Sequence, residues 1–157
     1  MSSPRSGLDW LFEGLSATAL LGAGWDLATH WSALPARIPT HFGASGNPNG
    51  WGGKDSLLLL LGTTAGMFIL LTIAESYQRL INIPIKVDRE SPAVRQLLRS
   101  MVIAMKAVIT VAFAWIVNLT IRTALGQADG LGVAFLPLFL AGILGPVVFY
   151  VVKLKKL

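Results

Sequence analysis

The residues with the most chemical capacity lie in one polar stretch, Leu34 to Lys54, between two apolar segments. This stretch is rich in glycine and proline, and its side chains can donate hydrogen bonds, accept them or stack on a ligand. The candidate ligand-binding residues are His41, Phe42, Asn47, Asn49, Trp51 and Lys54. We expect His41 to contact a ligand; the alternative is that its imidazole only holds the loop together through backbone carbonyls.

Catalytic and metal chemistry have little support in this sequence. The chain has no cysteine and two histidines, so a metal site would need His30, His41 and Asp26, whose spacing matches no familiar ligand pattern. The chain also lacks the HExxH, GxSxG and P-loop patterns. We therefore predict a non-catalytic protein with no metal and no other cofactor.

The elements that must position these residues are membrane helices. The chain is 54% hydrophobic and 13% charged, whereas a soluble domain usually has about 25% charged residues. A helical span needs about 20 mostly apolar residues. The predicted fold is all-α, with one integral membrane domain (1–157) and four transmembrane helices. Their predicted spans are about 8–30, 56–74, 100–125 and 131–152.

The motif loop, 31–55, is expected to form an ordered extracytoplasmic cap between the first and second spans. Its X-Pro pairs favour extended backbone, and its run of Gly, Asn and Pro favours tight turns. The first span is the weakest of the four because it contains Glu13 and Asp26. A cleavable signal peptide is the alternative for that segment, with Leu15 to Gly24 as its apolar core.

The basic residues predict an orientation. Most lie between the second and third spans or in the tail: Arg79, Lys86, Arg89, Arg95, Arg99, Lys153, Lys155 and Lys156. The positive-inside rule then places both termini in the cytoplasm and the motif loop outside. Topology accounts for the net charge of +5, so no nucleic-acid partner is expected. The basic tail could also touch anionic lipid headgroups.

Small residues in the spans predict close helix packing. Gly14 and Gly22 share one face of the first span, and Gly62 and Gly66 form a GxxxG pair in the second. Such rows let helix backbones approach closely. We favour packing inside this bundle; the alternative is a face for a second copy or another membrane subunit.

Charged residues within the spans need partners or access to water. Lys106 is expected to reach the cytoplasmic interface or to pair with Glu13 or Glu75. Arg122 shares a face with Asn118 near the outer end of the same span. The candidate partners of Arg122 are Asp26 and Asp129.

The motif loop resembles a known family. Its pattern, Leu-Pro-x-x-Ile-Pro-x-His-Phe and then Gly-x-Pro-x-Gly-Trp-Gly-x-Lys, resembles the domain-of-unknown-function family 1648, a bacterial membrane family that includes Sdp-type immunity and signalling proteins. The matching residues are Leu34, Pro35, Ile38, Pro39, His41, Phe42, Gly46, Pro48, Gly50, Trp51, Gly52 and Lys54. The family commonly has an acidic residue where Asn49 stands. The resemblance implies a multi-pass protein of the bacterial inner membrane that binds rather than catalyses.

Three functions follow as expectations. The first is immunity to a secreted peptide toxin, or sensing of it, through the outer loop. The alternative is an accessory subunit of a larger membrane complex, packed through the glycine faces. The third is a transporter or channel element. The expected partners are the lipid bilayer and either a peptide ligand or a membrane-protein complex, with a homo-oligomer as a further option.

Overall fold

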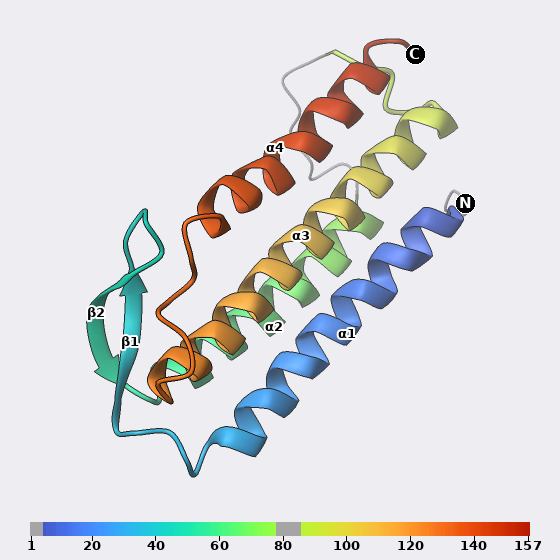
Figure 1. Ribbon diagram of the computed structural model, residues 1–157. Coiled ribbons are helices and arrows are strands. Elements are labelled where there is room, and N and C mark those ends of the chain that lie inside the picture. Colours follow the sequence, from blue (N-terminus) through green and yellow to red (C-terminus); the bar gives the residue numbers. More distant parts are fainter. Residues whose placement is uncertain (1–4, 78–85) are drawn as a thin grey trace.

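The computed structural model describes residues 5–77 and 86–157. Within them the chain forms four helices and one β-hairpin (Figure 1). The helices are α1 (Gly7–His30), α2 (Ser56–Ser76), α3 (Pro92–Ala124) and α4 (Phe135–Leu154). The hairpin consists of β1 (Arg37–Phe42) and β2 (Pro48–Gly53), which connect α1 to α2.

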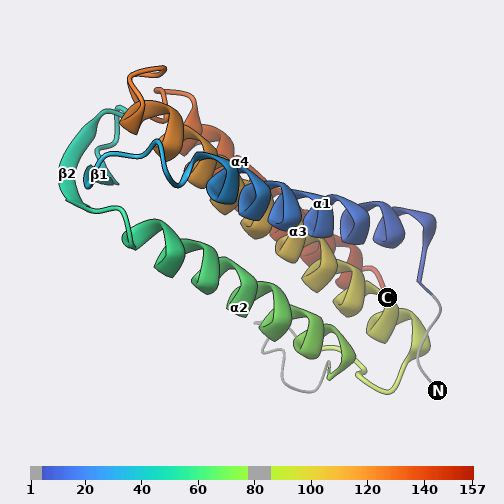
Figure 2. The same ribbon diagram turned by 90° about the horizontal axis from the view of Figure 1, so that it is seen from below.

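Helix α3 is the centre of the bundle, and α1, α2 and α4 all pack against it. Figure 1 shows α3 between α1 and α4 with α2 behind it, and Figure 2 shows the same helices from below. The hairpin lies at one end of the bundle; the start of α1 and the end of α4 lie at the other. The motif segment is therefore as far from the two ends of the described chain as the bundle allows.

Three of these helices are long and apolar enough to cross a membrane. The mean hydropathy of their most apolar windows is 2.3 for α2, 2.1 for α3 and 2.3 for α4. These helices indicate a multi-pass membrane protein, as predicted. Helix α1 is not in this group, because its 24 residues include Asp9, Glu13 and Asp26.

The motif loop is a two-stranded antiparallel sheet, so the all-α prediction was wrong at this point. Arg37 pairs with Gly53 and Phe42 with Pro48, and two irregularities interrupt the register on either side of His41. The predicted turn residues act as the hairpin connection, where Gly46 has a φ of 82°. Proline and glycine thus favour a bulged, twisted ribbon here in place of an irregular loop.

Two helix boundaries differ from the predicted spans. Helix α3 begins at Pro92. Proline is tolerated in the first helical turn because the backbone N–H that it lacks would have no hydrogen-bond partner within the helix there. Helix α4 begins at Phe135 and not near residue 131, because Gly130 and Gly132 have φ values of 146° and 77°. Arg79, which contributes to the orientation argument, lies outside the described residues.

The four glycines expected to pack helices do not do so within the described chain. A Cβ built on Gly14, Gly22, Gly62 or Gly66 meets no neighbouring atom within 4 Å. The prediction of packing inside this bundle was therefore wrong, because α1 turns other residues towards α3. Contact of these glycines with another chain stays a prediction.

Two apolar clusters hold the bundle together instead. The cluster at the hairpin end joins α1, β1, α2 and α3 through Ala23, Leu27, Leu34, Ile38, Leu57, Val117 and Ile121. The cluster at the other end joins α3 and α4 through Val94, Leu98, Met101, Ala104, Tyr150 and Leu154. The first cluster includes Ile38 of β1, so it fixes the hairpin on the helix ends.

Candidate functional site

The hairpin covers a pocket above the ends of α2 and α3. Its volume is about 470 Å³. Apolar side chains make up most of the wall, and hydroxyl groups and one imidazole interrupt it. The lining residues are Pro39, Thr40, His41, Phe42, Ser56, Leu57, Leu59, Leu60, Thr63, Ile116, Thr120 and Leu131. Such a mixture suits a ligand with both apolar and polar parts.

His41 and Asn49 meet across the hairpin. Nδ1 of His41 donates a hydrogen bond to Oδ1 of Asn49, and both residues are exposed. The close approach requires glycine opposite the histidine, since a Cβ on Gly50 would lie 2.9 Å from the Cβ of His41. The partner of the imidazole is a side chain and not the backbone carbonyl considered above, and His41 also lines the pocket.

Phe42 also lines the pocket, whereas the other three predicted site residues lie apart from it. Asn47 lies in the hairpin turn, where its carbonyl accepts from the N–H of Gly43 at 2.9 Å. Trp51 is 50% exposed on β2. Lys54 donates to the carbonyl oxygen of Trp31 at 3.2 Å, and its ammonium lies 4.7 Å from the centre of that indole ring. The lysine therefore ties the start of α2 to the end of α1.

Sequence reasoning missed the helical half of the pocket. Thr63 and Thr120 supply hydroxyl groups from α2 and α3. Isolated threonines in apolar helices commonly bond their own backbone, as Thr63 does with the carbonyl of Leu59 at 2.8 Å. The sequence carries no signal that distinguishes these threonines from others in the spans.

No metal centre is evident in residues 5–77 and 86–157, where no three His, Asp or Glu side chains converge. His30 lies beside Asp26, with 3.1 Å between Nδ1 and Oδ1. His41 instead pairs with Asn49 in the hairpin. The three residues considered for a metal thus belong to two different contacts.

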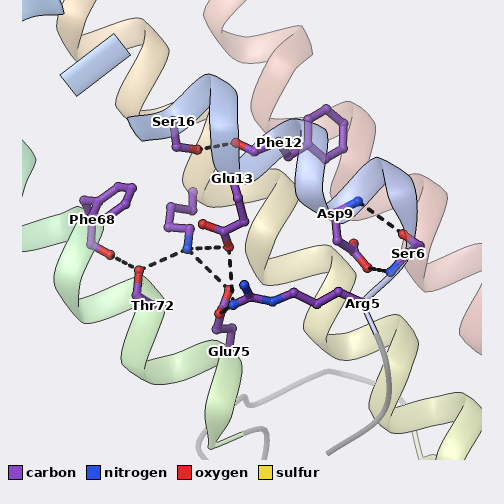
Figure 3. Close-up of polar contacts among 10 residues, drawn as sticks. Arg5, Ser6, Asp9, Phe12, Glu13, Ser16, Phe68, Thr72 and Glu75 are labelled. Atoms are coloured by element: carbon purple, nitrogen blue, oxygen red, sulfur yellow. Dashed lines mark hydrogen bonds and ion pairs between the residues drawn. The ribbon is translucent and has the colours of Figure 1, made fainter. Parts of the chain in front are cut away.

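A buried charge cluster lies at the opposite end of the bundle from the hairpin. Lys106 of α3 donates from Nζ to Glu13 at 2.7 Å, to Thr72 at 3.0 Å and to Glu75 at 3.3 Å. Arg5 donates to the other carboxylate oxygen of Glu75. Figure 3 shows the two carboxylates turned towards each other from α1 and α2. The expected pairing of Lys106 is confirmed, and it involves both candidate acids.

The centre of the cluster is buried, and the residues described in it carry two positive and two negative charges. Lys106 is 0% exposed and Glu75 is 1% exposed. An ammonium group has three donors, and each has an acceptor here. Arg5 and Lys106 match the charges of Glu13 and Glu75, and the ring of Phe68 lies 5.0 Å from the ammonium. Such a group belongs in a membrane interior only when it is paired in this way.

A second polar contact joins α1 to α3 nearer the hairpin. Nδ2 of Asn118 donates to Oδ2 of Asp26 at 2.8 Å. Arg122 donates from Nε to Oδ1 of Asn118 at 3.1 Å. The predicted meeting of Arg122 with Asp26 is therefore bridged by the amide of Asn118.

Residues 17–64, from mid-α1 through the hairpin into α2, match the family described as domain of unknown function, DUF1648. This segment of the chain is similar to the DUF1648 family. The resemblance seen in the motif loop is thereby confirmed, and the DUF1648 segment contains every hairpin residue that lines the pocket.

One curated relative of the chain is archaeal. The chain is 37% identical over 62 residues to an uncharacterized protein of Archaeoglobus fulgidus, and the match covers 34% of each protein. The chain thus spans about a third of that relative's length. No solved structure matches the chain.

Proposed function

We propose that this protein is a non-catalytic membrane protein that binds a peptide in the pocket beneath its hairpin. The observation that carries the proposal is the composition of that pocket, in which His41, Thr40 and Thr63 interrupt a mainly apolar wall. An amphipathic peptide presents the same two kinds of surface. Immunity to a secreted peptide toxin, or sensing of it, is the role that the family resemblance favours.

The proposal includes four membrane crossings, with both termini in the cytoplasm of a bacterial cell and the hairpin outside. Helix α1 has 24 residues, enough for about 36 Å of helix. Its acids at positions 13 and 26 contact partners on α3, since Glu13 bonds Lys106 and Asp26 bonds Asn118. Pairing of this kind lowers the cost of carrying carboxylates through a bilayer.

The test is a protection assay. The full chain is expressed in a strain sensitive to an Sdp-type peptide toxin, and survival is compared with that of the empty vector. We expect protection, and we expect His41→Ala and Thr63→Leu to reduce it by at least about tenfold, a cost typical of a lost polar contact. Membrane levels of each variant are measured in parallel by immunoblot.

Arg37→Ala is the matched control, because Arg37 is an exposed residue of the same strand that does not line the pocket. It should protect as well as the unmodified chain. Equal protection by His41→Ala and Arg37→Ala would contradict a role for the pocket. No protection by the unmodified chain would contradict the immunity role, and toxin binding in detergent would then test sensing.

An accessory subunit is the second candidate function. The observation in its favour is that Gly14, Gly22, Gly62 and Gly66 are exposed and meet no neighbour within the described chain. Small residues on open helix faces permit close contact with another transmembrane helix. Purification in mild detergent followed by native mass spectrometry tests this candidate, because Gly62→Leu with Gly66→Leu should release the protein from a larger assembly.

A further inference from the structure

A seam between α1 and α4 runs along one face of α3, away from the hairpin pocket and the charge cluster. Two pockets open on this seam. One has an apolar lining, and the other, called the polar pocket below, is lined by polar and apolar residues in equal number. Positions 93, 97, 100, 107, 111 and 115 of α3 line one pocket or the other. Successive positions in this set are three, four or seven residues apart, so they form one stripe along the helix.

The apolar pocket lies at mid-height in the bundle. Its volume is about 220 Å³, and no charged side chain lines it. The walls are the aromatic and aliphatic residues Phe12, Leu15, Val108, Val111, Trp115, Phe135, Leu138 and Phe139, and the floor includes Ala107 and Ala112. Small floor residues between large walls give a slot of the kind that accepts a hydrocarbon chain.

The polar pocket lies at the end of the bundle where α1 begins and α4 ends. Its volume is about 380 Å³. Its polar lining residues are Ser6, Gln96, Ser100, Tyr150 and Lys153. All of these side chains have donors, and Lys153 adds a positive charge. The acid beside this pocket, Asp9, is buried and accepts from the backbone N–H of Ser6 at 2.8 Å.

The spacing of the two pockets matches one phospholipid. Ser100 of the polar pocket and Val111 of the apolar pocket are 11 residues apart on α3, or about 16 Å along the helix. One leaflet of a bilayer core is about 15 Å thick. Phe12, a wall of the apolar pocket, is only partly buried and packs against the cluster that includes Tyr150 of the polar pocket.

We infer that this seam is a binding site for one anionic phospholipid, with an acyl chain in the apolar pocket and the phosphate headgroup at Lys153. The charge of Lys153 and the surrounding donors select an anionic phosphate. The hydrocarbon slot selects a lipid over a soluble phosphate. This site is independent of peptide binding at the hairpin and would exist whether or not that proposal holds.

Fluorescence quenching by brominated lipid tests the site, because Trp115 lines the apolar pocket. The chain has five tryptophans, so the other four are replaced by Phe to leave Trp115 alone. The protein is reconstituted in vesicles that contain dibrominated phosphatidylglycerol or dibrominated phosphatidylcholine. We expect phosphatidylglycerol to compete for the site around Trp115 about fivefold better, the factor that one lysine near a membrane surface contributes.

Three controls make the result decisive. A chain that retains only Trp25, which is 74% exposed on α1, should be quenched equally by the two lipids. Lys153→Gln should abolish the preference at Trp115, whereas Lys155→Gln, the same charge change at an exposed residue outside the pocket, should retain it. Val111→Phe should reduce quenching by both lipids, because it fills the slot.

The inference is overturned by equal quenching of Trp115 by the two lipids in the unmodified background. It is also overturned by equal effects of Lys153→Gln and Lys155→Gln. A preference that soluble glycerol phosphate removes would assign the site to free phosphate and not to a lipid. Folding of each variant is checked by size-exclusion chromatography, and the Lys153 comparison stands even if Val111→Phe does not fold.

Discussion

Lys106 and Glu13 are 93 residues apart in the sequence, yet Nζ of the lysine lies 2.7 Å from Oε1 of the glutamate. The lysine has no exposed surface, and its other two hydrogen bonds reach Thr72 and Glu75 of α2. One side chain of α3 therefore holds both neighbouring helices through polar contacts. In the bundle, this contact replaces the glycine packing expected between helices.

Replacing Lys106 by Met should lower the free energy of unfolding by about 3–5 kcal/mol, the usual cost of removing one partner from a buried ion pair. The physical reason is that Glu13 and Glu75 would stay buried without the ammonium that bonds both. Unfolding in mixed micelles with increasing sodium dodecyl sulfate measures the change. Lys155→Met removes an exposed lysine and is the matched control.

The double variant Lys106→Met with Glu13→Gln removes one positive and one negative charge together. Because Arg5 and Glu75 then remain as a pair, this variant should recover at least half of the stability lost by Lys106→Met. A double variant that is less stable than the single one would contradict the cluster as a charge-balanced unit.

Gly46→Ala should loosen the hairpin from the connection between α3 and α4. Gly46 has a φ of 82°, and an added Cβ would lie 2.4 Å from the carbonyl oxygen of Gly132. The substitution should also weaken the hydrogen bond from the N–H of Leu131 to the carbonyl of Gly46, now 2.8 Å. Hydrogen exchange at Leu131 should accelerate by at least about tenfold.

Gly53→Ala is the control for this experiment, since a Cβ at Gly53 meets nothing within 4 Å and its φ is not positive. Exchange at residue 131 should be unchanged in that variant. If both substitutions accelerated exchange equally, the loss of glycine flexibility and not the close backbone approach would be the cause.

Asn118→Leu should destabilise the bundle by about 0.6–2 kcal/mol, the range measured for hydrogen bonds between membrane helices. The substitution leaves the carboxylate of Asp26 without the amide donor at 2.8 Å. Thr123→Val is the comparison, because the hydroxyl of Thr123 is buried and has no hydrogen-bond partner in the described part of the chain. Its removal should be neutral or stabilising.

The test compares the change in the free energy of unfolding caused by Asn118→Leu with the change caused by Thr123→Val. Unfolding with increasing sodium dodecyl sulfate measures both changes. Equal destabilisation by Asn118→Leu and Thr123→Val would mean that side-chain packing, and not hydrogen bonding, determines the stability of the bundle around these two residues of α3.

Single cysteines should reveal the topology, since the chain has none of its own. Asn47→Cys lies in the exposed hairpin turn, and Lys155→Cys lies after α4 at the other end of the bundle. In intact cells, a membrane-impermeant maleimide should label Cys at position 47 and not at position 155. Labelling of both positions in inside-out vesicles would contradict four crossings.

The sequence by itself determined the membrane class, the helix positions and the family of the motif loop. Runs of apolar residues mark α2 and α4 to within a few residues, because lipid contact requires little more than length and hydropathy. The glycine and proline pattern marks the DUF1648 segment. The same pattern also predicted an ordered segment between α1 and α2. It did not predict the strand pairing, because glycine and proline favour turns whether or not the flanking residues form strands.

Only the tertiary structure decided which residues meet. Sequence spacing placed Gly14 and Gly22 on one face of α1, yet the helix turns Ala23 and Leu27 towards α3 and leaves the glycines open. Lys106 was expected to have one acidic partner and has two. Helix periodicity gives the relative angle of residues on one helix but not the rotation of that helix against its neighbours. The buried charges and the packed clusters fix that rotation, and with it the pockets.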